Sequence, residues 1–385
     1  MQPYSDQTRH NPMNLKRWAS VAAATALLIV LSACGSSKPK PAPLESFTPT
    51  KTVSELWSAR VDSLDQPGEL AVNDDTVVAG GSDGEIAAFD LRTGVKRWKI
   101  DVGSKLSALV GSDGRFTAVV TAQNELVVYE NGKERWRDRQ PGRVASPPFV
   151  AGERVFVQAV DRSVRAYDAL DGRWLWVYQR AGGESLALAV PSVLTSFGDT
   201  LLVGQGARLV GLDPLKGAPR FEVSMGTPRG SNEVERLADL IGPPARVDGD
   251  ICVRSFRLSV GCVNASAGTL RWTRPQAGTK SIAANGQIVV GADSSDRISA
   301  WKESNGDILW RVDRFTHRGL SGIAIWGDYV ATVDYEGYLH LLALDDGHTV
   351  GRFSLDGPLE VSPVVKNGVL LAQTRRGTVY ALRFN

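Results

Sequence analysis

Short apolar stretches alternate with polar turns along most of the chain, and the pattern recurs about every 40 residues. The clearest unit spans residues 146–176, SPPFVAGERVFVQAVDRSVRAYDALDGRWLW, where turns separate four apolar or alternating stretches. This spacing is typical of four antiparallel β-strands. One four-stranded unit cannot bury both of its faces, whereas units stacked radially can. The repeat therefore predicts a β-propeller.

Most units end with a glycine followed, four residues later, by a large aromatic residue. This ending occurs at Gly94–Trp98, Gly132–Trp136, Gly172–Trp176, Gly217–Phe221, Gly268–Trp272 and Gly306–Trp310. We expect the glycine to make a positive-φ turn between the third and fourth strands. The aromatic ring should fill the widening gap between neighbouring blades, as packing rather than as a surface on which a ligand stacks. A seventh ending is looser, because Gly351 takes the fourth position after Gly347 and the aromatic, Phe353, comes two residues later.

The two ends of the repeat region each contain part of one further blade. The C-terminal segment, RRGTVYALRFN, has the pattern of a third strand with no fourth strand after it. The segment VSELWSARV, residues 53–61, resembles a fourth strand that contains Trp57 but has no strands before it. Pairing the two closes an eighth blade and removes the open sheet edges. We therefore predict an all-β fold in which residues 53–385 form an eight-bladed propeller closed by its N-terminal strand.

The N-terminal region follows a different pattern. Lys16 and Arg17 precede an apolar run, WASVAAATALLIVL, which is too short to span a membrane and is typical of a signal peptide. The run leads into LSAC, which resembles the bacterial lipobox and predicts lipid attachment at Cys34; the alternative is an ordinary signal peptide with a chance cysteine. We expect residues 1–33 to be removed, with Met13 as the natural start. Residues 34–52 should form a flexible, Pro-rich tether.

The charge balance excludes one class of partner. The chain has 44 Lys and Arg and 42 Asp and Glu, and residues 1–33 contain three of the basic and one of the acidic residues. Removing them leaves 44 − 3 = 41 basic and 42 − 1 = 41 acidic residues, so the mature chain has no net charge. A non-specific nucleic-acid binder needs a basic surface, so we expect no nucleic acid as partner.

Candidates for catalysis and metal binding are few. GGSDG, residues 80–84, matches the pattern G-x-S-x-G, but a nucleophilic serine there needs a strand–turn–helix setting, and Ser82 falls in a predicted hairpin. The four histidines show no metal-ligand spacing. We therefore predict no catalytic residue, no metal and no cofactor.

The two cysteines of the repeat region, Cys252 and Cys262, lie on consecutive predicted strands of one blade. A three-residue turn centred on Arg257 would place them opposite each other. In an oxidising compartment they could then form a disulfide; the alternative is two buried free thiols.

One connection between blades is longer than the rest. Successive aromatic endings are mostly 38 to 45 residues apart, but Phe221 and Trp272 are 51 apart, and the extra residues are SMGTPRGSNEVERLADLIGPP. Asn232 and Glu235 have the spacing of a capping pair, and Val234, Leu237 and Leu240 recur at helical spacing, so we expect a short amphipathic helix. The exposed apolar residues predict a partner site, or alternatively a loop that covers its own blade edge.

These features together resemble two related groups of proteins. The blade repeat is similar to that of PQQ enzymes, and the lipobox, tether and eight blades resemble the BamB lipoproteins of the β-barrel assembly machinery over essentially the whole mature chain. The segment GSNEVERLADLI is similar to the family pattern G-S-T-E-[IL]-[DE]-R-[LM]-x-D-[VI]-D. The residues that match it in chemistry are Glu235, Arg236, Leu237 and Asp239, whereas Ile241 replaces the final aspartate. In the preceding loop, Leu186 and Leu188 match the leucines of L-x-L-R and Ala189 replaces the arginine.

The resemblance implies a non-enzymatic scaffold that assists the assembly and insertion of β-barrel proteins. It implies a lipid anchor at Cys34 in the outer membrane, facing the periplasm, and docking of the two loops on the POTRA domains of BamA. Other subunits of the complex and unfolded barrel proteins are further implied partners. Two alternatives remain. One is a lipid-anchored propeller that binds another envelope partner, such as a cell-wall ligand. The other is a quinoprotein-type redox enzyme, although such enzymes have adjacent cysteines, which this chain lacks.

Overall fold

The structure, a computed structural model, describes Met1, residues 39–180 and residues 186–384. Every regular element within these residues is a β-strand, and none is a helix that could cross a membrane. Apart from Met1, the expected signal peptide lies outside the described residues, and so does the expected lipidation site, Cys34. Pro41–Asn385 form one compact unit, to which the description below refers.

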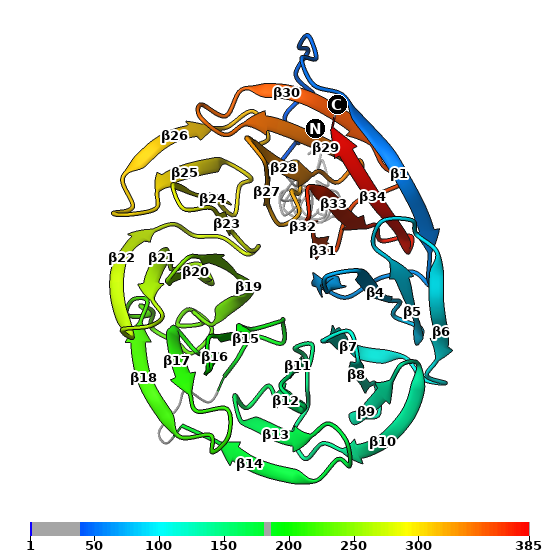
Figure 1. Ribbon diagram of the computed structural model, residues 1–385. Coiled ribbons are helices and arrows are strands. Elements are labelled where there is room, and N and C mark those ends of the chain that lie inside the picture. Colours follow the sequence, from blue (N-terminus) through cyan, green and yellow to red (C-terminus); the bar gives the residue numbers. More distant parts are fainter. Residues whose placement is uncertain (2–38, 181–185, 385) are drawn as a thin grey trace. The chain divides into compact units, whose positions relative to one another are not determined.

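Eight four-stranded antiparallel sheets form a ring, which confirms the predicted eight-bladed propeller (Figure 1). In the first seven blades the strands follow one another in chain order, from the centre of the ring to its rim. Blade 1 consists of β3 (Ala71–Val72), β4 (Thr76–Gly80), β5 (Glu85–Asp90) and β6 (Lys96–Asp101); blade 2 of β7 (Leu106–Ser112), β8 (Phe116–Thr121), β9 (Glu125–Glu130) and β10 (Lys133–Arg139); blade 3 of β11 (Phe149–Ala151), β12 (Arg154–Gln158), β13 (Val164–Asp168) and β14 (Trp174–Tyr178); and blade 4 of β15 (Leu194–Phe197), β16 (Thr200–Gln205), β17 (Arg208–Leu212) and β18 (Pro219–Ser224).

The next three blades repeat this arrangement. Blade 5 consists of β19 (Leu240–Val247), β20 (Asp250–Ser255), β21 (Ser259–Asn264) and β22 (Thr269–Pro275); blade 6 of β23 (Ala283–Ala284), β24 (Ile288–Ala292), β25 (Ile298–Lys302) and β26 (Ile308–Val312); and blade 7 of β27 (Ala324–Trp326), β28 (Tyr329–Val333), β29 (Tyr338–Ala343) and β30 (Thr349–Ser354). In each of these sheets the last strand lies at the outer edge of the ring (Figure 1).

Blade 8 joins the two ends of the propeller, as predicted. Its strands are β32 (Val364–Lys366), β33 (Val369–Gln373), β34 (Thr378–Phe384) and, at the rim, β1 (Val53–Arg60). β1 pairs antiparallel with β34, and Trp57 lies opposite Ala381. A short parallel pair of β2 (Gly68–Glu69) with β31 (Val361–Ser362) joins blades 1 and 8 near the centre of the ring.

The turn glycines and the aromatic residues of the repeat hold neighbouring blades together. Gly172 has a φ of 75°, as a positive-φ turn requires. The Trp136 ring of the preceding blade lies against it, so that a methyl group added to Gly172 would come within 2.7 Å of the ring. Trp136 Nε1 also donates to the Ala169 carbonyl in the same turn, at 2.9 Å. The aromatic that ends one blade therefore packs on the turn of the next blade.

The same contact recurs around the ring. The aromatic–glycine pairs are Trp57–Gly94, Trp98–Gly132, Trp176–Gly217, Phe221–Gly268, Trp272–Gly306 and Trp310–Gly347. Buried apolar clusters occupy the gaps between blades; one of them contains Trp57 with Val77 and Phe89 of blade 1 and Leu371 and Val379 of blade 8. The core is thus a series of wedges between sheets, and seven of the eight are closed at the rim by an aromatic ring that packs on a turn glycine.

The helix expected near residue 232 is absent from the described residues, and a single turn takes its place. The expected capping bond forms, from the Glu235 amide to Asn232 Oδ1 at 2.9 Å, and the Arg236 amide bonds the Asn232 carbonyl at 3.2 Å. Leu240 then begins β19, which pairs with β20. The sheet edge of β20 satisfies the backbone groups that a longer helix would have paired internally.

The tether expected over residues 34–52 is not free along its described length. Its main chain is hydrogen-bonded to the ring at both ends of the segment 42–51: the Ala42 amide bonds Thr316 O, and the amides of Thr50 and Lys51 bond Val350 O.

Candidate docking surface

Two blade-to-blade connections contain the residues that were predicted to bind a partner. One joins β14 to β15 and is described except for residues 181–185; the other joins β18 to β19. In a four-stranded meander, the hairpin between the second and third strands lies at the same end as the connection to the next blade. Both connections therefore lie on one face of the ring, which we call the connection face. A bond of 2.9 Å from the Leu240 amide to Gly206 O, in the β16–β17 hairpin, agrees with this placement.

A buried ion pair holds the two connections together. Asp239 is 7% exposed, and its Oδ1 accepts hydrogen bonds of 2.8 Å from the guanidinium of Arg162. Arg162 also donates to Leu186 O at 2.8 Å, and the other carboxylate oxygen of Asp239 accepts from the Leu188 amide at 3.3 Å. Asp239 thus ties the leucine loop to the β12–β13 hairpin, which contains Arg162.

Burial divides the predicted site residues into contact residues and supports. Glu235, Arg236 and Leu186 are exposed, whereas Leu188 and Leu237 are partly buried. Asp239 and Ile241 are buried; Ile241 pairs with Arg254 in β20 and forms a bridge to Ser192 at the end of the leucine loop. The structure therefore brings the two loops together, with Asp239 and Ile241 beneath the surface and the other five residues fully or partly exposed on it.

The turn of the second loop is held in one conformation by its own side chains. Glu235 Oε2 accepts from the amide and the hydroxyl of Ser231, at 2.8 and 3.0 Å, and Glu235 Oε1 accepts from Asn232 at 3.0 Å. These bonds, the Ser231 amide first, keep the pKa of Glu235 below its usual range. Val234 in this turn is 63% exposed, and Arg236 is exposed as well.

The space around the ion pair includes one small pocket and one larger cleft. The small pocket measures about 20 Å³ and is lined by Arg162, Leu188 and Asp239, which is room for roughly one water molecule. The cleft measures about 260 Å³, and its walls include Arg162, Arg180 and Arg208. Arg180 and Arg208 both pair with Glu222, at 3.2 and 2.9 Å. With Asp161 in the wall and Asp239 paired with Arg162, the three arginines of the cleft are balanced by three acids.

Sequence reasoning missed Arg162, which is central to this arrangement. It is 77 residues from Asp239 in the chain and belongs to a different blade. No local sequence pattern marks Arg162, because only the closed ring brings it near Asp239.

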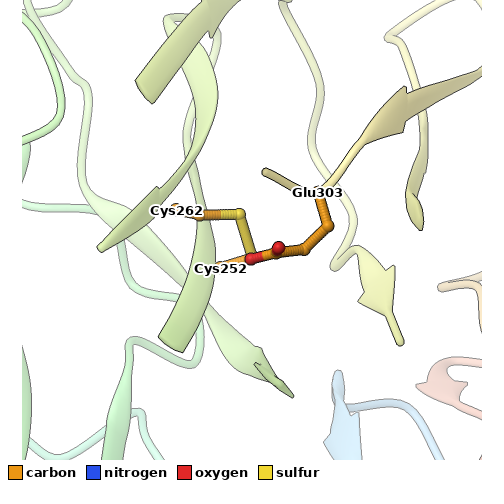
Figure 2. Close-up of side chains that lie close together, drawn as sticks. All are labelled: Cys252, Cys262 and Glu303. Carbon is orange, nitrogen blue, oxygen red and sulfur yellow. A yellow bond between two sulfur atoms is a disulfide. The ribbon is translucent and has the colours of Figure 1, made fainter. Parts of the chain in front are cut away.

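The other sequence candidates do not form a reactive centre among the described residues. Ser82 lies in the β4–β5 hairpin and accepts a hydrogen bond from the Asp65 amide at 2.8 Å, which is a structural role. Cys252 and Cys262 lie opposite each other on β20 and β21 and form a disulfide. Figure 2 shows the Glu303 carboxylate directed toward this disulfide. Burial, together with the nearby Asp250 carboxylate, raises the pKa of Glu303. The sulfur atoms are oxidised, so this group is not a metal site in the form described.

The centre of the ring contains a cavity of about 470 Å³. Its lining includes the prolines Pro147, Pro148, Pro191, Pro243 and Pro244. Glu69, which is exposed to this cavity, and Arg246 also line it. The disulfide lies outside this lining, so the cysteines do not face the cavity.

Comparison with known proteins assigns the chain to a family. The family model of the outer membrane protein assembly factor BamB matches residues 48–105, 82–312 and 303–385. The chain belongs to the BamB family. BamB of Burkholderia pseudomallei is 34% identical over 378 residues, which cover 96% of this chain and 99% of that protein. BamB of Escherichia coli K12 is 24% identical, over 89% of this chain and 91% of that protein.

Solved structures show the same fold. The crystal structure of BamB from Moraxella catarrhalis matches with a TM-score of 0.77 and 22% identity, over 86% of this chain and all of that one. A quinohemoprotein alcohol dehydrogenase from Comamonas testosteroni matches with a TM-score of 0.63 and 14% identity, over 86% of this chain and 76% of that one. The likeness to the dehydrogenase concerns the fold alone. The BamB family thus shares its ring architecture with redox enzymes.

Proposed function

We propose that this chain is a lipid-anchored, non-enzymatic scaffold of the machinery that assembles outer membrane proteins, and that it docks on BamA through its connection face. Its relatives are named outer membrane protein assembly factors. The lipobox supplies an anchor at Cys34, which would keep the ring at the periplasmic side of the outer membrane. The single observation that carries the docking proposal is the buried Arg162–Asp239 pair, which presents two exposed loops as one rigid surface.

The docking surface consists of Leu186, Leu188, Glu235, Arg236 and Leu237. Leu186 supplies an exposed apolar side chain, and Arg236 supplies an exposed charge on the other loop. Interfaces concentrate their energy in a few apolar and arginine side chains, while charges at the rim set the orientation of the partner. Asp239 and Ile241 act from below the surface as supports.

Arg162 also accounts for a departure from the family pattern. The pattern has an arginine in the leucine loop, where this chain has the exposed Ala189. Arg162 reaches the same loop from the β12–β13 hairpin and bonds the Leu186 carbonyl. A guanidinium group is therefore retained between the two loops, although it comes from another blade.

The test compares three variants in their binding to purified POTRA domains of BamA. Arg236→Glu should weaken binding about tenfold or more, equal to about 1.4 kcal/mol, with an unchanged melting temperature. Arg376→Glu is the matched control, because Arg376 is also exposed on the connection face but belongs to blade 8. It should bind like the wild type.

Asp239→Ala separates support from contact. It leaves Arg162 without its carboxylate in a site where both side chains are about one-tenth exposed, so the melting temperature and the binding should fall together. Wild-type binding by Arg236→Glu would overturn the docking surface. Wild-type melting of Asp239→Ala with weakened binding would show that Asp239 is itself a contact residue.

A further inference from the structure

The segment Ala42–Lys51, which we call the strap, lies against blade 7. Figure 1 shows the blue chain ahead of β1 folding back past β30 at the rim of the ring. The amides of Thr50 and Lys51 both donate to Val350 O in β30, at 2.9 and 3.0 Å. The C-terminal end of the strap therefore makes main-chain hydrogen bonds with the outer strand of this blade.

The sequence of blade 7 has a glycine that accommodates the strap. Gly351 stands four residues after Gly347, where six other repeats have a large aromatic residue. A methyl group on Gly351 would lie 2.8 Å from Lys51 O, so a larger side chain there would collide with the strap. In blade 8 the last two strands, β34 and β1, come from opposite ends of the chain, and no tight turn joins them. An aromatic at position 351 would have no turn glycine to pack on, and the strap fills its place.

Glu45 fastens the middle of the strap. Its carboxylate bonds Arg314 Nε at 2.9 Å and Thr349 Oγ1 at 2.8 Å, and its carbonyl accepts from Arg352 Nη2 at 3.0 Å. The guanidinium of Arg352 also lies over the Phe47 ring, 5.0 Å from its centre. Three side chains of the ring thus bind Glu45, and one of them also contacts Phe47, at sites that are partly shielded from water.

The far end of the strap is held by a buried arginine. Ala42 donates its amide to Thr316 O at 2.9 Å, and its carbonyl accepts from Arg318 Nη1 at 2.8 Å. Arg318 is 3% exposed and also pairs with Asp334 and Glu336. Without the strap, Nη1 of this buried arginine would lose its Ala42 partner, which makes a detached strap costly.

The position of Ala42 decides the direction in which the anchor leaves the ring. Asp334 and Glu336, which hold Arg318, lie in the hairpin between β28 and β29, which is on the connection face. We infer that the strap brings the lipid anchor out of the connection face beside blade 7, so that this edge of the ring is held against a lipid bilayer. The inference rests on the proposed anchor at Cys34. Eight residue steps from Cys34 to Ala42 span at most about 29 Å, whereas the nineteen steps to Val53 would span about 68 Å.

The experiment uses the full-length lipoprotein in vesicles of phosphatidylethanolamine and phosphatidylglycerol that contain an acceptor dye on the headgroup. A donor dye is placed at Arg376→Cys on the connection face or at Asp345→Cys in the β29–β30 turn on the opposite face; both native residues are exposed. The disulfide and the acylated Cys34 leave the new cysteine as the labelling site. Energy transfer should be several-fold more efficient from position 376 than from position 345.

Glu45→Lys places a cation against Arg314 and Arg352 and should detach the strap. Amide hydrogen exchange at Thr50 and Lys51 should then accelerate at least tenfold, and the difference between the two dye positions should disappear. Glu55→Lys, the same charge change on the exposed surface of β1, is the matched control and should change neither.

The outcomes separate the strap from the proposed anchor. If wild-type protein floats with vesicles but the two dyes transfer equally, the strap inference is overturned and the anchor stands. If the protein does not float, both are overturned, since the inference needs the anchor. If Glu45→Lys retains slow exchange at Thr50 and Lys51, Glu45 does not fasten the strap and the inference fails on that ground alone.

Discussion

At the scale of single residues, the most unusual group is a buried chain of charges in blade 7. His340 is fully buried; its Nε2 lies 2.9 Å from Asp334 Oδ2, and Arg352 Nε lies 3.4 Å from Nδ1. Because an arginine can only donate, Nδ1 accepts, and the neutral ring donates from Nε2 to Asp334. The rings of Phe315 and Tyr338 cover His340, and Arg318 adds a further positive charge near it.

The electrostatics of this chain predict a loss of stability in mild acid. Burial lowers the pKa of His340, and the attraction of Asp334 only partly opposes this. The unfolded chain therefore binds a proton at His340 near pH 6.5 while the folded chain does not, so stability falls as the pH drops below that value. Burial alone would raise the pKa of Asp334, but its bonds with His340 and Arg318 hold it below the usual range, so its own effect comes only at lower pH.

His340→Gln should remove this pH dependence, because the amide can donate to Asp334 and accept from Arg352 without titrating. Urea unfolding between pH 7.5 and 5 should show a wild-type slope that is steeper by up to about 1.4 kcal/mol per pH unit. His348→Gln, at an exposed position, is the control and should keep the wild-type slope. Equal slopes for His340→Gln and wild type would show that folding does not lower the pKa of His340.

The candidate docking site shows what single residues reveal before the structure is known. Leu186 and Arg236 could be selected from the sequence, because the resemblance to a family pattern marks them and they prove to be exposed. The support role of Asp239 could not, since a carboxylate at a matching position looks the same whether it faces a partner or a buried arginine. Its role depends on Arg162, which only the closed ring brings near.

At the scale of the element, the turn before each outer strand has two separate requirements for glycine. The turn needs a positive φ, and the aromatic ring of the preceding blade packs where a side chain on this residue would otherwise lie. The sequence pattern predicted the positive φ and the position of the ring between blades. It did not predict that the ring packs on the turn glycine itself. Because both requirements fall on one residue, the pattern is strong enough to count blades.

Two glycines of blade 3 separate the requirements. Gly172 has a φ of 75° with the Trp136 ring 2.7 Å from an added methyl group, whereas Gly152 has a φ of 59° with open space around it. Gly152→Ala should lower the free energy of unfolding by about 1–2 kcal/mol, the cost of a positive φ. Gly172→Ala should cost about 1–3 kcal/mol more, because the methyl group displaces the ring. Equal losses in urea titrations of the two variants would remove the packing role of the turn.

The expected helix does not form, and the local sequence does not show why. Asn232 accepts the expected capping bond from the Glu235 amide, so a single turn forms where the helix was expected to begin. The apolar residues after them, Leu240 and Ile241, have a competing partner in β20, and the strand ladder prevails. Helical spacing over so short a segment cannot outweigh a sheet edge that lies next to it.

At the scale of the whole propeller, closure depends on nine residues at the N-terminal end of the ring. β1 pairs along the full length of β34, and Trp57 packs on Gly94 while its Nε1 bonds Leu91 O in blade 1 at 2.9 Å. The strand therefore joins blade 8 to blade 1 as well as completing its own sheet. The sequence predicted this closure because both unpaired ends were visible as fragments of the same repeat.

A chain that begins at Val53 and one that begins at Asp62 differ only in this closing segment. Both lack the strap, so its loss cannot explain a difference between them. The longer chain should melt in one cooperative transition as a monomer, because every blade has two neighbours. The shorter chain exposes the edge of β34 and the buried residues Val379 and Ala381, and it should associate or lose its cooperative transition. Adding a peptide of residues 53–61 should restore the monomer, since β1 docks as a separate strand. Identical melting curves and elution volumes for the two chains would mean that the ring closes by contacts other than β1.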